Sequence, residues 1–189
     1  MSNTKLIAVL LVAVVASTAA WFAFFAKESA PDFTAYAAGP DRKAAFFEYF
    51  TPIVVEVNKE LATDRVQIQS SCNADEADNL DQFLTKFRVD DADLEQESAC
   101  EVLLRRADIV PASLAIAQAA KETGWGTSRF ALEGNAIFGQ WTWTGKGIEP
   151  LDKTKGSHKV LRFPILRASV KAYKKNLNTH KSYKEFREI

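Results

Sequence analysis

The first pattern along the chain is an uninterrupted apolar run near the N-terminus. Residues 6–26 carry no charged side chain, and about 20 apolar residues suffice for a helix to cross a bilayer core. A signal peptide has a shorter apolar core that ends in small residues. This run instead continues through aromatic residues from Trp21 to Phe25, which suit a membrane interface. We therefore predict an uncleaved membrane anchor at residues 1–27, with the rest of the chain exported. A cleaved signal peptide is the alternative.

Beyond this run, apolar residues recur at helical spacing. Residues 28–41 are punctuated by proline and glycine and are predicted to form a short tether. Large apolar side chains then follow at intervals of 4, 3, 4 and 4, which places them on one helix face: Phe46, Phe50, Ile53, Val57 and Leu61. Pro52 interrupts this pattern and is expected to kink the helix or to begin a second one. We expect one folded domain over residues 42–189.

Two later stretches repeat the helical pattern. One is short and carries Leu80, Phe83, Leu84 and Phe87. The other carries Ser169, Val170, Tyr173 and Leu177, with lysines between them. Both patterns predict amphipathic helices that pack on a core.

The charges are balanced overall but segregated along the chain. There are 24 Lys and Arg against 24 Asp and Glu, which argues against a general nucleic-acid binder. Residues 60–101 hold 12 acidic and 3 basic residues, whereas residues 153–187 hold 11 basic residues and one acidic residue. The basic segment is either a solvated helix face, partly neutralised by the acidic segment, or a surface that attracts an anionic polymer.

Metal and cofactor sites are not indicated. The acidic cluster of Asp90, Asp91 and Asp93 lacks the glycine and glutamate spacing of a calcium loop. The chain has only two histidines and two cysteines, too few for a histidine-rich or four-cysteine zinc site. In an exported protein, Cys72 and Cys100 either pair as a structural disulfide or remain free thiols.

The residues with the clearest chemistry lie between positions 108 and 143. Pro111 suits the first turn of a helix and Gly124 suits its left-handed end, so Glu122 falls in the last turn. The partial negative charge of a helix C-terminus disfavours an ionised carboxylate, and apolar surface from Trp125 would add to this effect. A carboxylic acid that keeps its proton can protonate a glycosidic oxygen. The alternative is an exposed structural glutamate.

Aromatic and amide side chains are dense after this helix. The aromatic residues are Trp125, Phe130, Phe138, Trp141 and Trp143, interleaved with Asn135 and Gln140. Sugars bind by stacking on aromatic rings and by hydrogen bonding to amides, although some of these rings must serve the core instead.

These residues carry a resemblance to a known family. Residues 119–130 (AAKETGWGTSRF) and 133–141 (EGNAIFGQW) resemble the Bax-type glucosaminidase-related proteins of bacteria, which belong with the peptidoglycan N-acetylglucosaminidases. Further similar segments lie at 46–54, 103–106, 169–173 and 176–183, so the resemblance covers residues 41–189.

The resemblance implies a mainly α, lysozyme-like fold with a small β-hairpin lobe, which we place between Ile148 and Phe163. It implies cleavage of a β-1,4 bond in the glycan strand, with Glu122 as the catalytic acid. Side chains expected to contact the substrate are Trp125, Asn135, Phe138, Gln140, Trp141 and Tyr173.

The second catalytic group stays open at this stage. Glu149 in the hairpin is one candidate, and the substrate's own N-acetyl group is another. Related proteins carry a cysteine pair after the Gln-Trp dipeptide that is absent here, so a disulfide would join Cys72 to Cys100. The family continues beyond position 189, which suggests that this chain is shortened at its C-terminus.

The expected function is therefore an endo-β-N-acetylglucosaminidase acting on peptidoglycan without a metal or organic cofactor. In a bacterium, the anchor would hold the domain at the inner membrane, facing the periplasm; a cleaved signal would release it there. The alternatives are a non-catalytic glycan-binding scaffold and a lytic transglycosylase.

Overall fold

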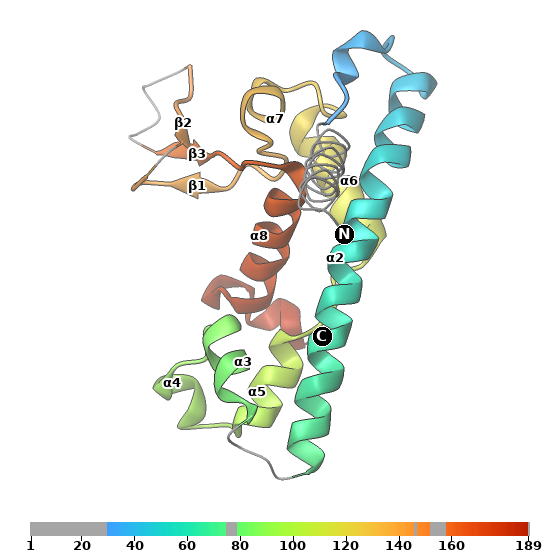
Figure 1. Ribbon diagram of the computed structural model, residues 1–189. Helices are drawn as coiled ribbons and strands as arrows, with labels where there is room; N and C mark the ends of the chain where they lie inside the picture. The colour runs from blue at the N-terminus through green and yellow to red at the C-terminus, as the bar shows by residue number, and fades with distance from the viewer. Residues whose placement is uncertain (1–29, 75–78, 146, 152–157, 189) are drawn as a thin grey trace, which may run out of the picture. The chain divides into compact units, whose positions relative to one another are not determined.

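The computed structural model describes residues 30–74, 79–145, 147–151 and 158–188 (Figure 1). These residues form a mainly helical domain with one small antiparallel sheet, which confirms the predicted fold class at that level. The expected anchor at residues 1–27 lies outside the described residues. Of the helices within the described ranges, none combines the length and the apolar character needed to span a bilayer.

The longest element is α2, Pro40–Asn73. A proline suits its first turn, because the N–H group that proline lacks has no helical partner there. The buried face of α2 carries Phe46, Phe50, Val54, Val57, Asp64 and Ile68. Ile53 and Leu61, which were expected on this face, are only half-buried, because the buried stripe passes from Phe50 through Val54 to Val57.

Three helices pack along α2 (Figure 1). They are α5 (Ala99–Arg106), α6 (Ala112–Thr123) and α8 (Leu166–Thr179). α6 buries mostly small side chains against the core, among them Ala115 and Ala119, and small side chains let helix backbones approach closely.

Pro52 does not begin a second helix, so that part of the expectation is wrong. α2 runs through Pro52 as one element. Pro52 is exposed, so water can hydrate the carbonyl group that loses its helical hydrogen bond. Packing of α5, α6 and α8 along both halves of α2 favours a single helix over two.

A second part of the core lies at the C-terminal end of α2. The short helices α3 (Asp81–Lys86) and α4 (Asp91–Leu94) pack on α5 there. The buried members of this cluster are Ile68, Leu80, Phe83, Phe87, Leu103 and Ala107. A disulfide joins Cys72, in the last turn of α2, to Cys100 at the start of α5, and their Cα atoms lie 6.0 Å apart.

The sheet has three short strands. They are β1 (Trp141–Thr142), β2 (Gly147–Ile148) and β3 (Lys159–Leu161), and β3 lies between the other two. Val160 pairs with both Trp141 and Ile148 in antiparallel register. The β2–β3 pair confirms the predicted hairpin, while β1 was not predicted. Residues 152–157, between β2 and β3, lie outside the described residues.

Helix α7 (Arg129–Gly134) connects the helices to this sheet. Arg129 Nη2 donates to the backbone oxygen of Glu149 at 2.6 Å, and Arg162 donates to the backbone oxygen of Glu133. These bonds fix the hairpin on α7. After α8 the described chain finishes with two 3-10 turns, η4 (Lys181–Tyr183) and η5 (Glu185–Glu188).

Part of the expected tether packs on the domain. Phe33, in the short 3-10 turn η1 (Phe33–Ala35), is only 2% exposed. Its ring lies 5.4 Å from that of Phe46 and 6.1 Å from that of Tyr49. The prolines and glycine of this segment predicted a break between helices. They gave no indication that Phe33 packs on Phe46 and Tyr49.

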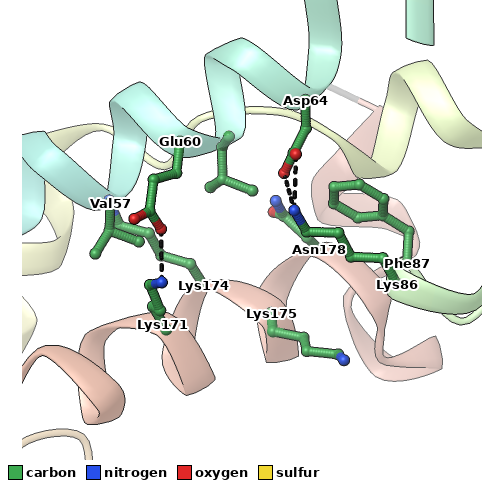
Figure 2. Close-up of a pocket in the computed structure, with 10 residues that line it drawn as sticks. Val57, Glu60, Asp64, Lys86, Phe87, Lys171, Lys174, Lys175 and Asn178 are labelled. Carbon is green, nitrogen blue, oxygen red and sulfur yellow. Dashed lines mark hydrogen bonds and ion pairs between the residues drawn. The ribbon is translucent and has the colours of Figure 1, made fainter. Parts of the chain in front are cut away.

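The acidic and basic segments meet where α2 faces α8 (Figure 2). Glu60 pairs with Lys171 at 2.8 Å and also with Arg167, and Asp64 pairs with Lys86 at 2.6 Å. These pairs border a pocket of about 190 Å³. The Glu60 pairs join the acidic segment to the basic one, as predicted, whereas Asp64 and Lys86 both belong to the acidic segment.

One lysine of this interface is buried. Lys174 is 1% exposed, and its Nζ donates to the backbone oxygen of Val54 at 2.8 Å and to Asn58 Oδ1 at 2.5 Å. Burial lowers the pKa of Lys174 to about 8, because an ammonium group loses hydration in the interior. Lys174 thus links α8 to α2 through these hydrogen bonds, and its buried position makes protonation of its amine less favourable.

Removing the disulfide is expected to destabilise the domain. Replacing both Cys72 and Cys100 with serine frees a loop that spans a sequence separation of 28, so the free energy of unfolding should fall by about 3–4 kcal/mol. Urea unfolding of the variant, followed by circular dichroism, measures this difference. The wild type with reductant added is the control and should unfold at the same urea concentration as the variant. Equal midpoints for the oxidised wild type and the variant would contradict the expectation.

Lys174 is expected to give stability a specific pH dependence. Its pKa in the folded state, about 8, is lower than its ordinary value of 10.5. Between these pH values the unfolded chain binds the proton and the folded chain does not, so stability rises with pH by up to about 1.4 kcal/mol per unit. The free energy of unfolding of the wild type, minus that of Lys174→Met, should therefore increase from pH 8 to 10. A difference that stays flat or decreases would exclude this role for Lys174.

Candidate functional site

The end of α6 is shaped by a left-handed turn. Gly124, Trp125 and Gly126 all have positive φ, at 57°, 63° and 82°. This conformation is costly for a bulky residue such as tryptophan. Thr123 Oγ1 supports the turn, since it accepts a hydrogen bond from the Gly126 N–H at 2.8 Å. The predicted helix end at Gly124 is confirmed.

Gly126 allows the turn to approach Phe33. A Cβ atom at position 126 would lie 2.4 Å from Phe33 Cδ2, a distance that atoms cannot adopt. The Trp125 ring, in turn, packs edge-on against Phe46 and Phe47 of α2. Its described contacts are thus with α2, whereas the sequence suggested apolar cover for Glu122.

Glu122 lies in the last turn of α6, as predicted, and its side chain is exposed. Its carboxylate faces the segment that follows α7. A Cβ atom built on Gly139 would lie 4.0 Å from Glu122 Oε2. Gly139 has a φ of 57°, so any other residue there would have a strained backbone. The two similar segments of the sequence, residues 119–130 and 133–141, therefore lie close together at Glu122.

Asn135 holds the start of this segment. It ends α7 with a φ of 50°, and its Nδ2 donates to the backbone oxygen of Phe163 at 3.0 Å. The backbone N–H of Ile137 donates to Ser169 Oγ at 3.3 Å. Asn135 was predicted to contact the substrate; its described hydrogen bonds instead join α7 to the chain that leaves β3.

Phe138 and Tyr173 form a stacked pair beside this segment. Their ring centroids lie 3.9 Å apart and their planes differ by 6°. Tyr173 is 4% exposed, and its hydroxyl donates to Gln118 Oε1 at 2.6 Å. Burial, with a smaller contribution from Tyr183, raises the pKa of Tyr173 to about 12. Tyr173 is therefore a neutral hydrogen-bond donor that fixes Gln118, four residues before Glu122 on α6.

The sheet presents exposed aromatic rings. Trp141 is 59% exposed and Trp143 is 70% exposed. The Trp141 ring stacks on His158 at 4.2 Å and lies edge-on to Trp143 at 6.2 Å. Exposed rings of this kind offer flat apolar faces to a ligand. The substrate contact predicted for Trp141 stays a prediction.

A pocket of about 300 Å³ begins beside Trp141. It is lined by Arg88, Gln140, Trp141, Leu161, Ala172, Lys175 and Asn176. Gln140 Oε1 is buried and has no hydrogen-bond donor among the described residues. An unpaired buried acceptor is unfavourable.

Glu149 follows β2, and its carboxylate pairs with Lys159 on β3 at 3.5 Å. Its side chain is 56% exposed. The contacts described for Glu149 thus belong to the hairpin and to Arg129. Within the ranges that the structure describes, no group of three or more His, Cys, Asp or Glu side chains is arranged to hold a metal ion.

Comparisons with known proteins place the chain in a family. A glucosaminidase family model, described as mannosyl-glycoprotein endo-beta-N-acetylglucosaminidase, matches residues 98–188. The protein bax of Escherichia coli (strain K12) is 32% identical over 165 residues, which is 85% of this chain and 59% of that protein. The chain belongs to the Bax-type glucosaminidase family. It thus spans about three fifths of the length of the curated relative that it matches.

No solved structure matches this glucosaminidase-family chain significantly. The lysozyme-like likeness of its fold therefore stays a prediction. The family model covers Glu122, the turn after it and the three described strands, so the site described above lies inside the residues that the family model matches.

Some residues of this site were missed by sequence reasoning. Gln118 lies one helical turn before Glu122, and this four-residue spacing could have identified it as a neighbour. Arg88 and Lys175 come from segments that only the folded chain brings together. His158 is likewise placed against Trp141 by strand pairing, which the sequence did not indicate.

The turn at residues 124–126 gives a matched pair of variants in this glucosaminidase domain. Gly126→Ala and Gly124→Ala both place a side chain at positive φ. A Cβ atom at position 126 collides with Phe33, whereas one at position 124 meets only Thr127 Oγ1, at 3.3 Å. Gly126→Ala should therefore be less stable than Gly124→Ala by roughly 1–3 kcal/mol. Chemical unfolding in urea measures both, and equal losses would show that the approach of Phe33 is not limiting.

Proposed function

We propose that this chain is an endo-β-N-acetylglucosaminidase that cleaves β-1,4 bonds in the glycan strands of peptidoglycan. The observation that carries the proposal is the position of Glu122. Glu122 lies in the last turn of α6, within the residues that the family model matches, and its carboxylate is exposed next to Gly139. We also propose that residues 1–27 anchor the domain to the inner membrane, with the domain in the periplasm.

Glu122 acts as the general acid in this proposal. Its carboxyl group would donate a proton to the glycosidic oxygen of the leaving sugar. Protonation of the leaving oxygen accompanies the formation of an oxocarbenium-like transition state. The left-handed turn at residues 124–126 keeps α6 from continuing, so the carboxylate faces open solvent, where a glycan can reach it.

The substrate would lie along residues 138–141. Phe138 is stacked on Tyr173 and thereby held in place, and the exposed Trp141 ring offers a face for a sugar. The apolar faces of pyranose rings stack on exposed aromatic rings of this kind. Gln118, fixed by Tyr173, would present its amide group to the same stretch.

The second group of the reaction is either Glu149 or the substrate's N-acetyl oxygen. Glu149 is held at the sheet by its pair with Lys159 and by the bond from Arg129 to its backbone. If Glu149 activates water, Glu149→Gln should slow cleavage by about 10²–10⁴-fold. If the N-acetyl group assists, this variant should retain most of its activity.

The direct test is the Glu122→Gln variant of the full chain. Release of reducing ends from purified sacculi should fall by about 10²–10⁴-fold, because amide nitrogen cannot donate the required proton as an acid does. Glu48→Gln, a change at an exposed glutamate of α2, is the matched control and should cleave as the wild type does. Thermal unfolding of both variants checks that the fold is kept.

Mass spectrometry of the products separates the alternatives. Reducing N-acetylglucosamine ends support the proposal. Anhydro-muramyl ends would assign a lytic transglycosylase instead. Equal binding of the wild type and Glu122→Gln to sacculi, with no products from either, would assign a non-catalytic scaffold. Unchanged product release by Glu122→Gln would remove Glu122 from the mechanism.

A further inference from the structure

The pocket beside Trp141 carries positive charge without matching acids. Arg88, which follows α3, and Lys175, on α8, both line it. Both side chains are exposed, and neither forms an ion pair within the described residues. The neighbouring cations behave differently, since Lys171 pairs with Glu60 and Lys86 pairs with Asp64. Two cations at this pocket are therefore available to a ligand.

The electrostatic surroundings of Lys175 support this reading. Partial burial, and then the charges of Arg88 and Lys86, lower the pKa of Lys175. Like charges that lie close together repel, and a bound anion would relieve that repulsion. The pocket therefore favours a negatively charged group.

The rest of the lining suits a polar, sugar-linked ligand. Gln140 and Asn176 offer amide groups, and Gln140 Oε1 has no donor in the described part of the chain. Trp141 forms one wall and is also the exposed ring of the sheet. Gln140 and Trp141 directly follow Gly139, which lies next to the Glu122 carboxylate. The pocket therefore adjoins the proposed site along the chain.

We propose that this pocket binds a carboxylate carried by the glycan, with Arg88 and Lys175 as the charged contacts. This inference rests on the proposed glycan-cleaving function and adds a specificity to it. Glycan strands that carry peptide branches present such carboxylates at regular intervals, and an uncharged glycan presents none. The chain should therefore cleave a carboxylate-bearing glycan faster than an uncharged one.

The experiment compares three substrates with the full chain. They are glycan strands with their peptide branches, the same strands stripped of peptides, which keep only the carboxylate attached to the sugar, and uncharged chitin oligosaccharides. The test variant is Arg88→Gln combined with Lys175→Gln. Lys171→Gln is the matched control, since it removes one charge from the same helix at a lysine that does not line this pocket.

The double variant should cleave peptide-bearing strands about 3–10-fold more slowly than the wild type, as expected for the loss of exposed charge pairs. Its cleavage of chitin oligosaccharides should be unchanged. If cleavage of stripped strands also falls, the pocket accepts the carboxylate on the sugar as well as those of the peptide, because the sugar carboxyl is bound as an amide while the peptide is attached. If it does not fall, the pocket is specific for the peptide carboxylates. A double variant that matches Lys171→Gln on every substrate would overturn the proposal.

A binding measurement keeps this inference separate from the proposed function. Calorimetry with a disaccharide–peptide fragment should show weaker binding by the double variant than by the wild type, whether or not the chain cleaves glycan. If the wild type cleaves none of the substrates but this difference in binding persists, the proposed function fails and the pocket assignment stands. If all substrates are cleaved and the double variant binds as the wild type does, the pocket assignment fails and the function stands.

Discussion

The left-handed turn at residues 124–126 is the constraint on which the site depends. Three successive residues with positive φ end α6 immediately after Glu122 and Thr123. One of them is tryptophan, for which this conformation is unfavourable, so the surrounding contacts must maintain it. Phe33 under Gly126 and the rings of Phe46 and Phe47 around Trp125 supply those contacts. The same turn leaves the Glu122 carboxylate at an exposed helix end beside Gly139.

The segregated charges of the chain are partly paired in the fold. Glu60 of the acidic segment pairs with Lys171 of the basic segment between α2 and α8, and Asp64 of α2 pairs with Lys86 of α3. Arg88 and Lys175 form no ion pair within the described residues, and they line a pocket near the proposed site.

Local signals explain what the sequence could predict. The helix that carries Glu122 was predicted with its end at Gly124, because proline, small residues and glycine define it within one short stretch. The hairpin was expected from the family resemblance and not from a local pattern. β1 was not, since a two-residue strand is defined only by its pairing with β3. The continuity of α2 through Pro52 and the burial of Phe33 and Lys174 likewise depend on partners distant in sequence, which no local pattern reveals.

The central claim is that a glycan binds with its scissile oxygen at the Glu122 carboxylate. A crystal structure of the Glu122→Gln variant of the full chain with a bound peptidoglycan fragment tests it most directly. The account predicts a glycosidic oxygen within about 2.6–3.2 Å of the side chain at position 122, with a sugar ring against Trp141. A fragment bound away from this helix end would contradict the account.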